Sequence, residues 1–151
     1  MTKPELYVSQ WFNTDHDITL TSLLGKVVVV EAFQMLCPGC VLHGLPLMKK
    51  VQRAFSEDTV AVIGLHSVFE HHAAMTPVSL QAFLHEYRIT FPVGVDVAGT
   101  GPLPKTMQTF QMRGTPSMLI FDKEGTLRAH HFGDVSEIAL GAEIATLICE
   151  T

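Results

Sequence analysis

Several features that would mark a secreted, membrane or nucleic-acid-binding protein are missing from this sequence. Only three of its 151 residues are cysteines, whereas a small scaffold held together by disulfides has a larger, even number. No run approaches the roughly 18 apolar residues of a membrane-spanning helix, and the formal net charge of −5 favours neither nucleic acid nor anionic membranes. Residues 1–5 also lack the apolar core of a signal peptide. We therefore expect no membrane span, no nucleic-acid partner and a cytoplasmic location, or a periplasmic one if a signal peptide has been removed.

The apolar content is that of a folded protein. Apolar residues make up 47% of the sequence, and a chain of this length can bury a substantial core. No repeat, linker or low-complexity segment divides it. We expect a single domain over residues 1–151, acting as a monomer.

Two of the three cysteines stand close together. Cys37 and Cys40 enclose Pro38 and Gly39, after an apolar run at residues 26–33 and before a helical pattern. A thiol at the start of a helix lies near unpaired N–H groups and the positive end of the helix dipole, which favour the thiolate. The spacing also lets the second thiol reach the first and close a small disulfide ring. We interpret the pair as a redox site, since zinc would need two further ligands at suitable spacing.

Apolar residues follow two alternating periods along the chain, one typical of strands and one of helices. Strands are expected at residues 6–12, 26–33, 60–65, 91–95, 117–121 and 126–132, and helices at 38–56, 79–87, 105–111 and 136–148. Pro46 should kink the first helix, and Pro92 favours an edge position for the strand at 91–95. The pattern predicts an α/β protein with a mixed sheet between helical layers.

A second motif precedes the strand expected at 117–121. Residues 113–116 read Arg-Gly-Thr-Pro, and together with the cysteine pair they resemble the thioredoxin superfamily over about residues 9–148. The resemblance implies a thioredoxin-like three-layer fold, with a mixed β-sheet flanked by helices. Residues 66–97 resemble the extra helix-strand insertion of the TlpA-like and redoxin (AhpC/TSA-like) branch.

The resemblance also implies roles for three side chains. Cys37 corresponds to the attacking cysteine and Cys40 to the resolving cysteine. Glu31, six residues before Cys37, falls where thioredoxins carry a buried acid. We interpret it as the catalytic base for Cys40, because burial would raise its pKa toward neutrality.

Four further residues are expected to bind substrate. Pro116 corresponds to the cis-proline that packs against the disulfide. The Thr115 backbone would then be free to pair with an extended substrate strand. Pro38 and Gly39, between the cysteines, complete this set.

The resulting hypothesis is a thiol–disulfide oxidoreductase that uses its Cys-Pro-Gly-Cys dithiol to reduce or exchange protein disulfides. Its partners would be a protein disulfide or dithiol substrate and a redox partner, either a reductase or an oxidant. The chemistry requires no cofactor and no metal.

Three alternatives stay open at this point. A redoxin-like thiol peroxidase resembles the same fold, but carries a threonine where Gln34 stands. A copper- or metal-delivery protein of this fold would add a histidine to the cysteine pair, and the chain has eight histidines, among them His43 and His66. A non-catalytic binding module would be expected to lose a cysteine or the Thr-Pro pair.

Three sulfur-containing residues outside the pair complete the expectations. Cys149 should be a small buried apolar residue on the last helix. Met35 and Met118 flank the predicted site and are candidates for a hydrophobic substrate surface.

Overall fold

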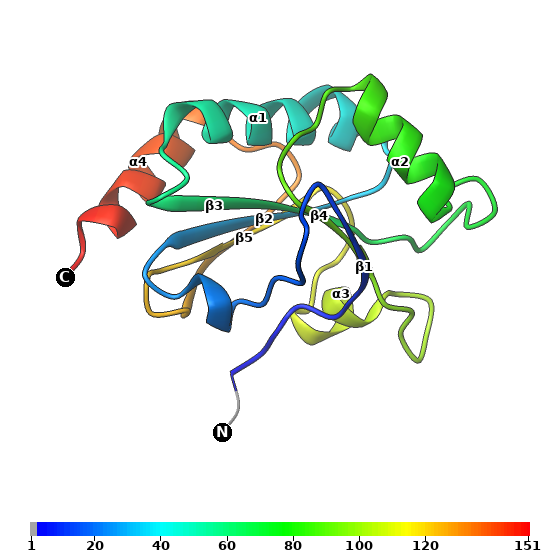
Figure 1. The fold of residues 1–151 in the computed structure, drawn as a ribbon, viewed down its shortest axis with the longest axis horizontal. Coiled ribbons are helices and arrows are strands. Elements are labelled where there is room, and N and C mark those ends of the chain that lie inside the picture. Colours follow the sequence, from blue (N-terminus) through cyan, green and yellow to red (C-terminus); the bar gives the residue numbers. More distant parts are fainter. Residues whose placement is uncertain (1–2) are drawn as a thin grey trace.

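A six-stranded mixed β-sheet runs through the protein, and the computed structural model describes residues 3–151 (Figure 1). Its strand order is β1-β4-β3-β2-β5-β6, with β2, β3 and β4 mutually parallel and the other three strands antiparallel to their neighbours. The strands are β1 (Val8–Phe12), β2 (Val27–Phe33), β3 (Val60–His66), β4 (Val93–Asp96), β5 (Ser117–Phe121) and β6 (Leu127–Phe132). The predicted mixed sheet is confirmed.

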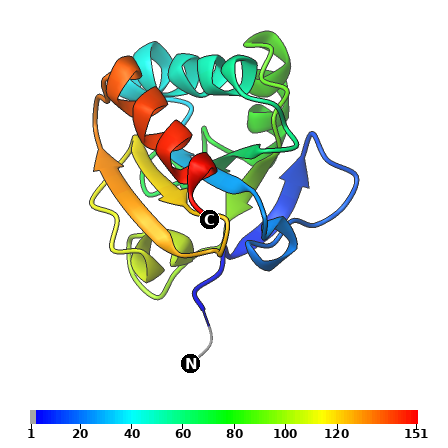
Figure 2. The same ribbon diagram turned by 90° about the vertical axis from the view of Figure 1, so that its left-hand side faces the viewer.

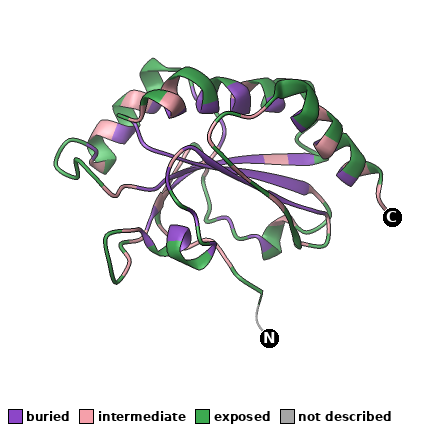
Figure 3. Cartoon of the chain, turned by 180° about the vertical axis from the view of Figure 1, so that it is seen from behind, coloured by how far each residue is buried: buried purple, intermediate pink, exposed green. Residues whose placement is uncertain are grey.

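Helices cover both faces of this sheet and complete a three-layer fold (Figures 1 and 2). The longer helices, α1, α2 and α4, lie over one face, and the short α3 lies with the turn η1 on the other. Their bounds are α1 (Leu45–Ala54), α2 (Pro77–Glu86), α3 (Lys105–Thr109), α4 (Glu137–Cys149) and η1 (Thr21–Leu23). Buried residues concentrate in the sheet and on the inward sides of the helices (Figure 3).

Strand β2 lies at the centre of the sheet, and all seven of its residues are buried. Val27, Val29 and Phe33 pack toward α1 and α4, whereas Val28 and Val30 pack toward α3. A strand covered on both faces needs a continuous apolar run, which explains the sequence pattern. Its one charged residue is therefore conspicuous, and it belongs to the site described below.

The helix that follows the cysteine pair contains a widened turn. Helical backbone begins at Pro38, passes through the π-helical segment η2 (Cys40–Gly44) and continues as α1. The Leu45 N–H donates to the Cys40 carbonyl, five residues earlier. Proline inside an α-helix lacks an N–H group and clashes with the carbonyl four residues before it. The distortion expected at Pro46 thus takes the form of a π turn on its N-terminal side.

The expectation that residues 91–95 form an edge strand is wrong. Strand β4 lies between β1 and β3. Pairing with β3 begins at Val93, so Pro92 precedes the strand, and its carbonyl accepts the Gly64 N–H at 2.9 Å. The missing proline N–H therefore does not prevent an interior position, and β1 covers the other side of β4.

Candidate functional site

The two cysteines lie where β2 gives way to the first helix. The turn at residues 34–36 leads to Cys37, which is half-buried, and Cys40 is completely buried one helical turn later. Both are free thiols. The Cys40 N–H donates to the Cys37 sulfur at 3.3 Å, and the Cys37 thiol donates to the Thr115 carbonyl at 3.5 Å. The pair therefore combines one accessible sulfur with one enclosed sulfur.

The loop before β5 packs directly on this helix. Its Thr115–Pro116 peptide bond is cis, as the resemblance implies. A Cβ atom at Gly39 would lie 3.4 Å from the Pro116 ring, and one at Gly44 would lie 3.2 Å from it. The two glycines leave room for the proline to approach the helix closely. The sequence thus brings Gly39, Thr115 and Pro116 together around the cysteines, while Pro38 is exposed at the helix start.

Glu31 lies beneath this helix on β2, with only 2% of its surface exposed. Its Oε1 would be 3.3 Å from a Cβ atom at Gly44, and its Oε2 has no hydrogen-bond partner. Burial raises the pKa of Glu31 well above its ordinary value, and negative charge on Cys37 raises this pKa further. Glu31 is the acid buried next to η2, the segment that begins with Cys40.

The surroundings of Cys40 disfavour ionisation of its thiol. Burial is the main factor that raises the pKa of Cys40, and a hydrogen bond with Cys37 adds to the effect. Hydrogen bonds from the Gln34 main chain and the Thr115 side chain act in the opposite direction. Ionisation of this thiol therefore depends on the groups that donate to its sulfur.

Two buried polar residues beside the pair were not identified as site residues from the sequence. Gln34 joins the turn before Cys37 to Thr115 and Phe69, and His66 accepts the Met35 N–H at 3.3 Å through Nε2. The only sequence signals were the place of Gln34 three residues before Cys37 and that of His66 at the end of a buried strand. Among residues 3–151, no group of three or more His, Cys, Asp or Glu side chains is arranged to bind a metal ion.

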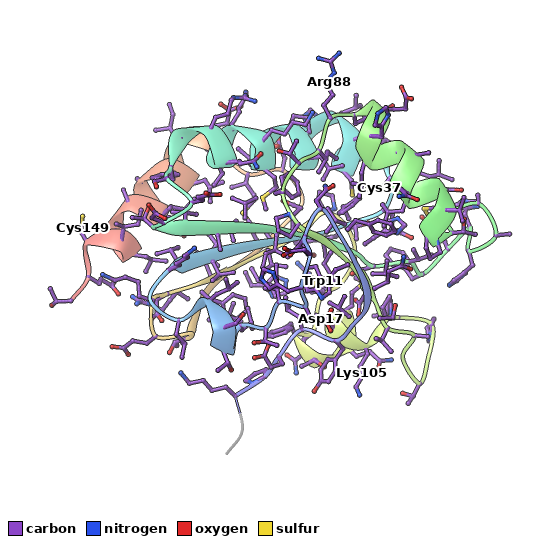
Figure 4. All side chains as sticks on the ribbon, in the orientation of Figure 1. Trp11, Asp17, Cys37, Arg88, Lys105 and Cys149 are labelled. Carbon is purple, nitrogen blue, oxygen red and sulfur yellow. The ribbon has the colours of Figure 1, made fainter. Side chains whose placement is uncertain are left out.

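Three sulfur-containing residues are not where the sequence suggested. Met35 and Met118 are buried and line the core rather than a substrate surface, because both side chains pack between the sheet and its helices. Cys149 is exposed at the end of α4, outside the apolar face that Ile144 and Leu147 form, and it lies across the molecule from Cys37 (Figure 4). The exposed apolar side chains near the site are instead Leu36, just before Cys37, and Phe132, next to the residue whose N–H binds the Pro116 carbonyl.

Fold and site together define a thioredoxin-like redox protein. The model of the AhpC/TSA family matches residues 4–130, and the chain belongs to this family. Among solved structures, the thioredoxin-like superfamily protein SPOA0173 is 70% identical with a TM-score of 0.97. A thiol-disulfide isomerase from Corynebacterium glutamicum is 48% identical with a TM-score of 0.94. Each comparison covers 98% of this chain and 96% of the other chain.

Two curated relatives are more distant and much longer. NHL repeat-containing protein 2 from Gallus gallus is 36% identical over 104 residues, and protein DipZ from Mycobacterium tuberculosis is 27% identical over 136 residues. These matches cover 66% and 88% of this chain but only 14% and 19% of the relatives. The chain thus spans less than a fifth of the length of these two proteins. None of the helices described for residues 3–151 has the length and apolar character needed to cross a bilayer.

We expect acid to destabilise the fold through His66. Burial lowers the pKa of His66 from 6.5 to about 4, so between these pH values the folded state binds fewer protons than the unfolded state. The stability that depends on neutral His66 is complete above about pH 6.5 and is lost as the pH falls through 4. This loss amounts to up to about 3 kcal/mol. The variant His66→Gln should therefore lose less stability than the wild type between pH 7 and pH 4, measured by denaturant unfolding of the reduced protein.

The matched control for this experiment is His43→Gln, because His43 is exposed. That variant should follow the pH dependence of the wild type. Equal losses for the wild type and His66→Gln would show that His66 does not cause the acid sensitivity.

Proposed function

We propose that this protein is a thiol–disulfide oxidoreductase that uses Cys37 and Cys40 to reduce or exchange disulfides in protein substrates. The observation that carries the proposal is the half-buried Cys37 sulfur, 3.3 Å from the N–H of the buried Cys40 and beside the cis Thr115–Pro116 bond. The similarity to a protein described as a thiol-disulfide isomerase supports the same class of reaction. We propose that the protein acts as a monomer together with a separate redox partner.

The reaction has two exchange steps. The Cys37 thiolate attacks one sulfur of a substrate disulfide, forms a mixed disulfide and releases the other substrate sulfur as a thiolate, which takes up a proton. Cys40 then loses its proton and attacks the Cys37 sulfur. This closes the Cys37–Cys40 disulfide and releases the second substrate sulfur. Two electrons pass from the dithiol to the substrate, and a reductase then restores the dithiol. In the reverse direction the Cys37–Cys40 disulfide oxidises a substrate dithiol, and an oxidant restores the disulfide.

The remaining residues of the site bind the substrate and move the proton. Glu31 accepts the proton of Cys40, since its buried carboxyl has a free oxygen and a raised pKa. We assign substrate binding to Thr115 and Pro116, whose loop lies beside Cys37, and to Pro38 and Gly39 between the cysteines. The Thr115 carbonyl is 3.5 Å from the Cys37 sulfur, and Gly39 packs against the Pro116 ring.

Disulfide exchange is favoured over peroxide reduction by the environment of Gln34. This residue stands where the redoxin peroxidases carry a threonine. Its side chain is buried and bonded at both ends, to Thr115 and to the Phe69 main chain. It therefore cannot present a hydroxyl group to a peroxide next to Cys37.

The reduction potential of the Cys37–Cys40 pair tests the proposal. The protein would be equilibrated in graded thiol–disulfide buffers, alkylated and weighed, in a Cys149→Ser background that removes the exposed third thiol. We expect a reversible two-electron transition. A potential near or below about −250 mV would indicate a reductant suited to the cytoplasm, and one between about −180 and −120 mV an oxidant or isomerase suited to the periplasm. Absence of any reversible transition would refute the proposed function.

A further inference from the structure

An arginine lies over an aromatic ring at the start of the loop that contacts Cys37. The guanidinium carbon of Arg113 is 5.1 Å from the centre of the Phe132 ring, a distance at which the face of the ring attracts the cation. Arg113 is exposed, and 48% of the surface of Phe132 is exposed. The ring therefore supports the guanidinium from one side and leaves its N–H groups open to a ligand.

The Phe132 ring is held in place by the end of β6. It packs against the Gly114 main chain, since a Cβ atom at Gly114 would lie 3.2 Å from a ring carbon. The next residue, Gly133, donates its N–H to the Pro116 carbonyl at 2.9 Å. The end of β6 and the cis-proline loop thus form one packed unit, and the ring that supports the arginine belongs to it.

This unit includes the main-chain group nearest to the reactive sulfur. The Thr115 carbonyl is 3.5 Å from the Cys37 sulfur. Arg113 precedes Thr115 by two residues, a separation of at most about 7 Å along the backbone. A substrate segment bound at Cys37 therefore passes close to an exposed cation.

Arg113 has no acidic partner within the protein. None of the ion pairs formed among residues 3–151 includes it. Arg128, near the other end of β6, instead pairs with both Asp122 and Glu150. The chain carries 15 acidic residues and 10 basic residues, so a cation without a carboxylate beside the site is contrary to its overall charge.

The titratable groups on β6 that face Arg113 supply no negative charge either. Burial lowers the pKa of His130, and the nearby positive charges of Arg113 and His131 lower it further. The His131 ring contacts the Glu143 carboxylate at 2.8 Å and so occupies that acid. Asp134, just after this strand, borders a hollow beside α1. The charge of Arg113 is therefore available to a substrate.

We propose that Arg113 is a specificity-determining residue that binds an Asp or Glu side chain of the substrate, close to the cysteine that Cys37 attacks. This inference rests on the proposed function, since it names the substrate class of the same site. A guanidinium group matches a carboxylate with two parallel N–H donors. The Phe132 ring holds the guanidinium without neutralising its charge. Protein disulfides flanked by acidic residues should therefore react faster than those flanked by neutral or basic residues.

The test uses short peptides, each joined through its single cysteine to a small aromatic thiol. Each peptide carries Glu, Gln or Lys at one position, one to three residues from the cysteine on either side. Cys37 attacks the peptide sulfur, forms a disulfide with the peptide and releases the aromatic thiolate, which is followed by stopped-flow absorbance. All proteins would carry Cys149→Ser, and each rate would be divided by that of a small neutral thiol with the same peptide. This division removes the intrinsic reactivity of the peptide.

The wild type should prefer the acidic peptide. At one or more positions, the Glu peptide should react about threefold faster than the matched Gln peptide at low salt, as expected for an exposed ion pair. The ratio should approach one in 1 M salt, because salt screens exposed charges.

Three variants assign this preference to one side chain. Arg113→Gln should bring the ratio of the Glu rate to the Gln rate to about one, and Arg113→Glu should favour the Lys peptide instead. Phe132→Leu should lose part of the preference, since it removes the ring face that holds the guanidinium. Arg53→Gln is the matched control, because it removes the same charge from an exposed position in the last turn of α1, and it should keep the wild-type ratio.

Two results would overturn the inference while leaving the proposed function intact. One is a wild type that releases the aromatic thiolate at equal rates from the Glu and Gln peptides at every position. The other is a preference for Glu that survives in Arg113→Gln or falls equally in Arg53→Gln. Failure of the wild type to release the aromatic thiolate from any peptide would instead refute the proposed function itself.

Discussion

Replacing Cys37 by serine should reduce the rate of disulfide exchange by on the order of a thousandfold or more. A serine hydroxyl stays protonated near neutral pH and does not attack sulfur as a thiolate does. Cys40 cannot take over the attack, because it is completely buried and burial raises its pKa. The measurement is the rate at which each variant reduces a small disulfide-bonded test protein in the presence of a chemical reductant.

Cys40→Ser separates the two steps of the same reaction. It leaves the Cys37 sulfur free to attack but removes the resolving thiol, so a mixed disulfide with the test protein should accumulate and appear as a covalent complex by mass. Cys149→Ser is the control, because Cys149 is exposed at the end of α4 and lies far from the pair (Figure 4). Exchange that survives in Cys37→Ser but is lost in Cys149→Ser would show that the attacking thiol is Cys149 and not Cys37.

Much of the site could be predicted because its signals are local in the sequence. A buried strand, two cysteines and a helical pattern follow one another within about 15 residues, so chain connectivity alone places the pair at the end of β2. The cis-proline is distant in sequence, but β5 pairs directly with β2. Knowledge of the fold class therefore brings Pro116 close to Cys37.

The environment of each side chain could not be predicted in the same way. Whether β4 lies at an edge depends on β1, which comes from the N-terminal end of the chain, far from β4 in sequence. Gln34 appeared only as a departure from a peroxidase pattern, because its partners Thr115 and Phe69 are far away in sequence. The exposure of Cys149 likewise depends on which side of α4 packs on the sheet, because Leu147 of the same helix turn is buried.

The predicted role of Glu31 rests on its burial, which the structure shows. The structure also shows a close approach of the helix to Glu31 that the sequence does not predict. The π turn of η2 and the absence of a side chain at Gly44 bring the helix close to both the Glu31 carboxyl and the Pro116 ring. A glycine in this turn could not have been interpreted from the sequence, since only the packed structure shows which atoms a Cβ atom would meet.

Glu31→Gln should slow the resolving step by about 100-fold near neutral pH. Glutamine has nearly the same shape but cannot accept the proton that Cys40 must lose. The rate of Cys37 attack should change far less, so the mixed disulfide should persist in the variant. The measurement is the rate of release of an aromatic thiol from the Cys37 mixed disulfide, recorded as a function of pH. The wild-type profile should show the ionisation of Glu31, and the variant should lose it.

The pH dependence of stability is a second, independent measurement on the Glu31→Gln variant. Because burial raises the pKa of Glu31, the folded state holds this proton at pH values where the unfolded state has released it. The stability that depends on protonated Glu31 is complete below its ordinary pKa of 4.5 and is lost as the pH rises through the higher folded value. Glu31→Gln removes this loss and should gain stability relative to the wild type as the pH rises above 4.5. Glu57→Gln, at an exposed position, should show neither effect. A variant that gains alkaline stability yet resolves at the wild-type rate would show that Glu31 is a buried acid without a part in proton transfer.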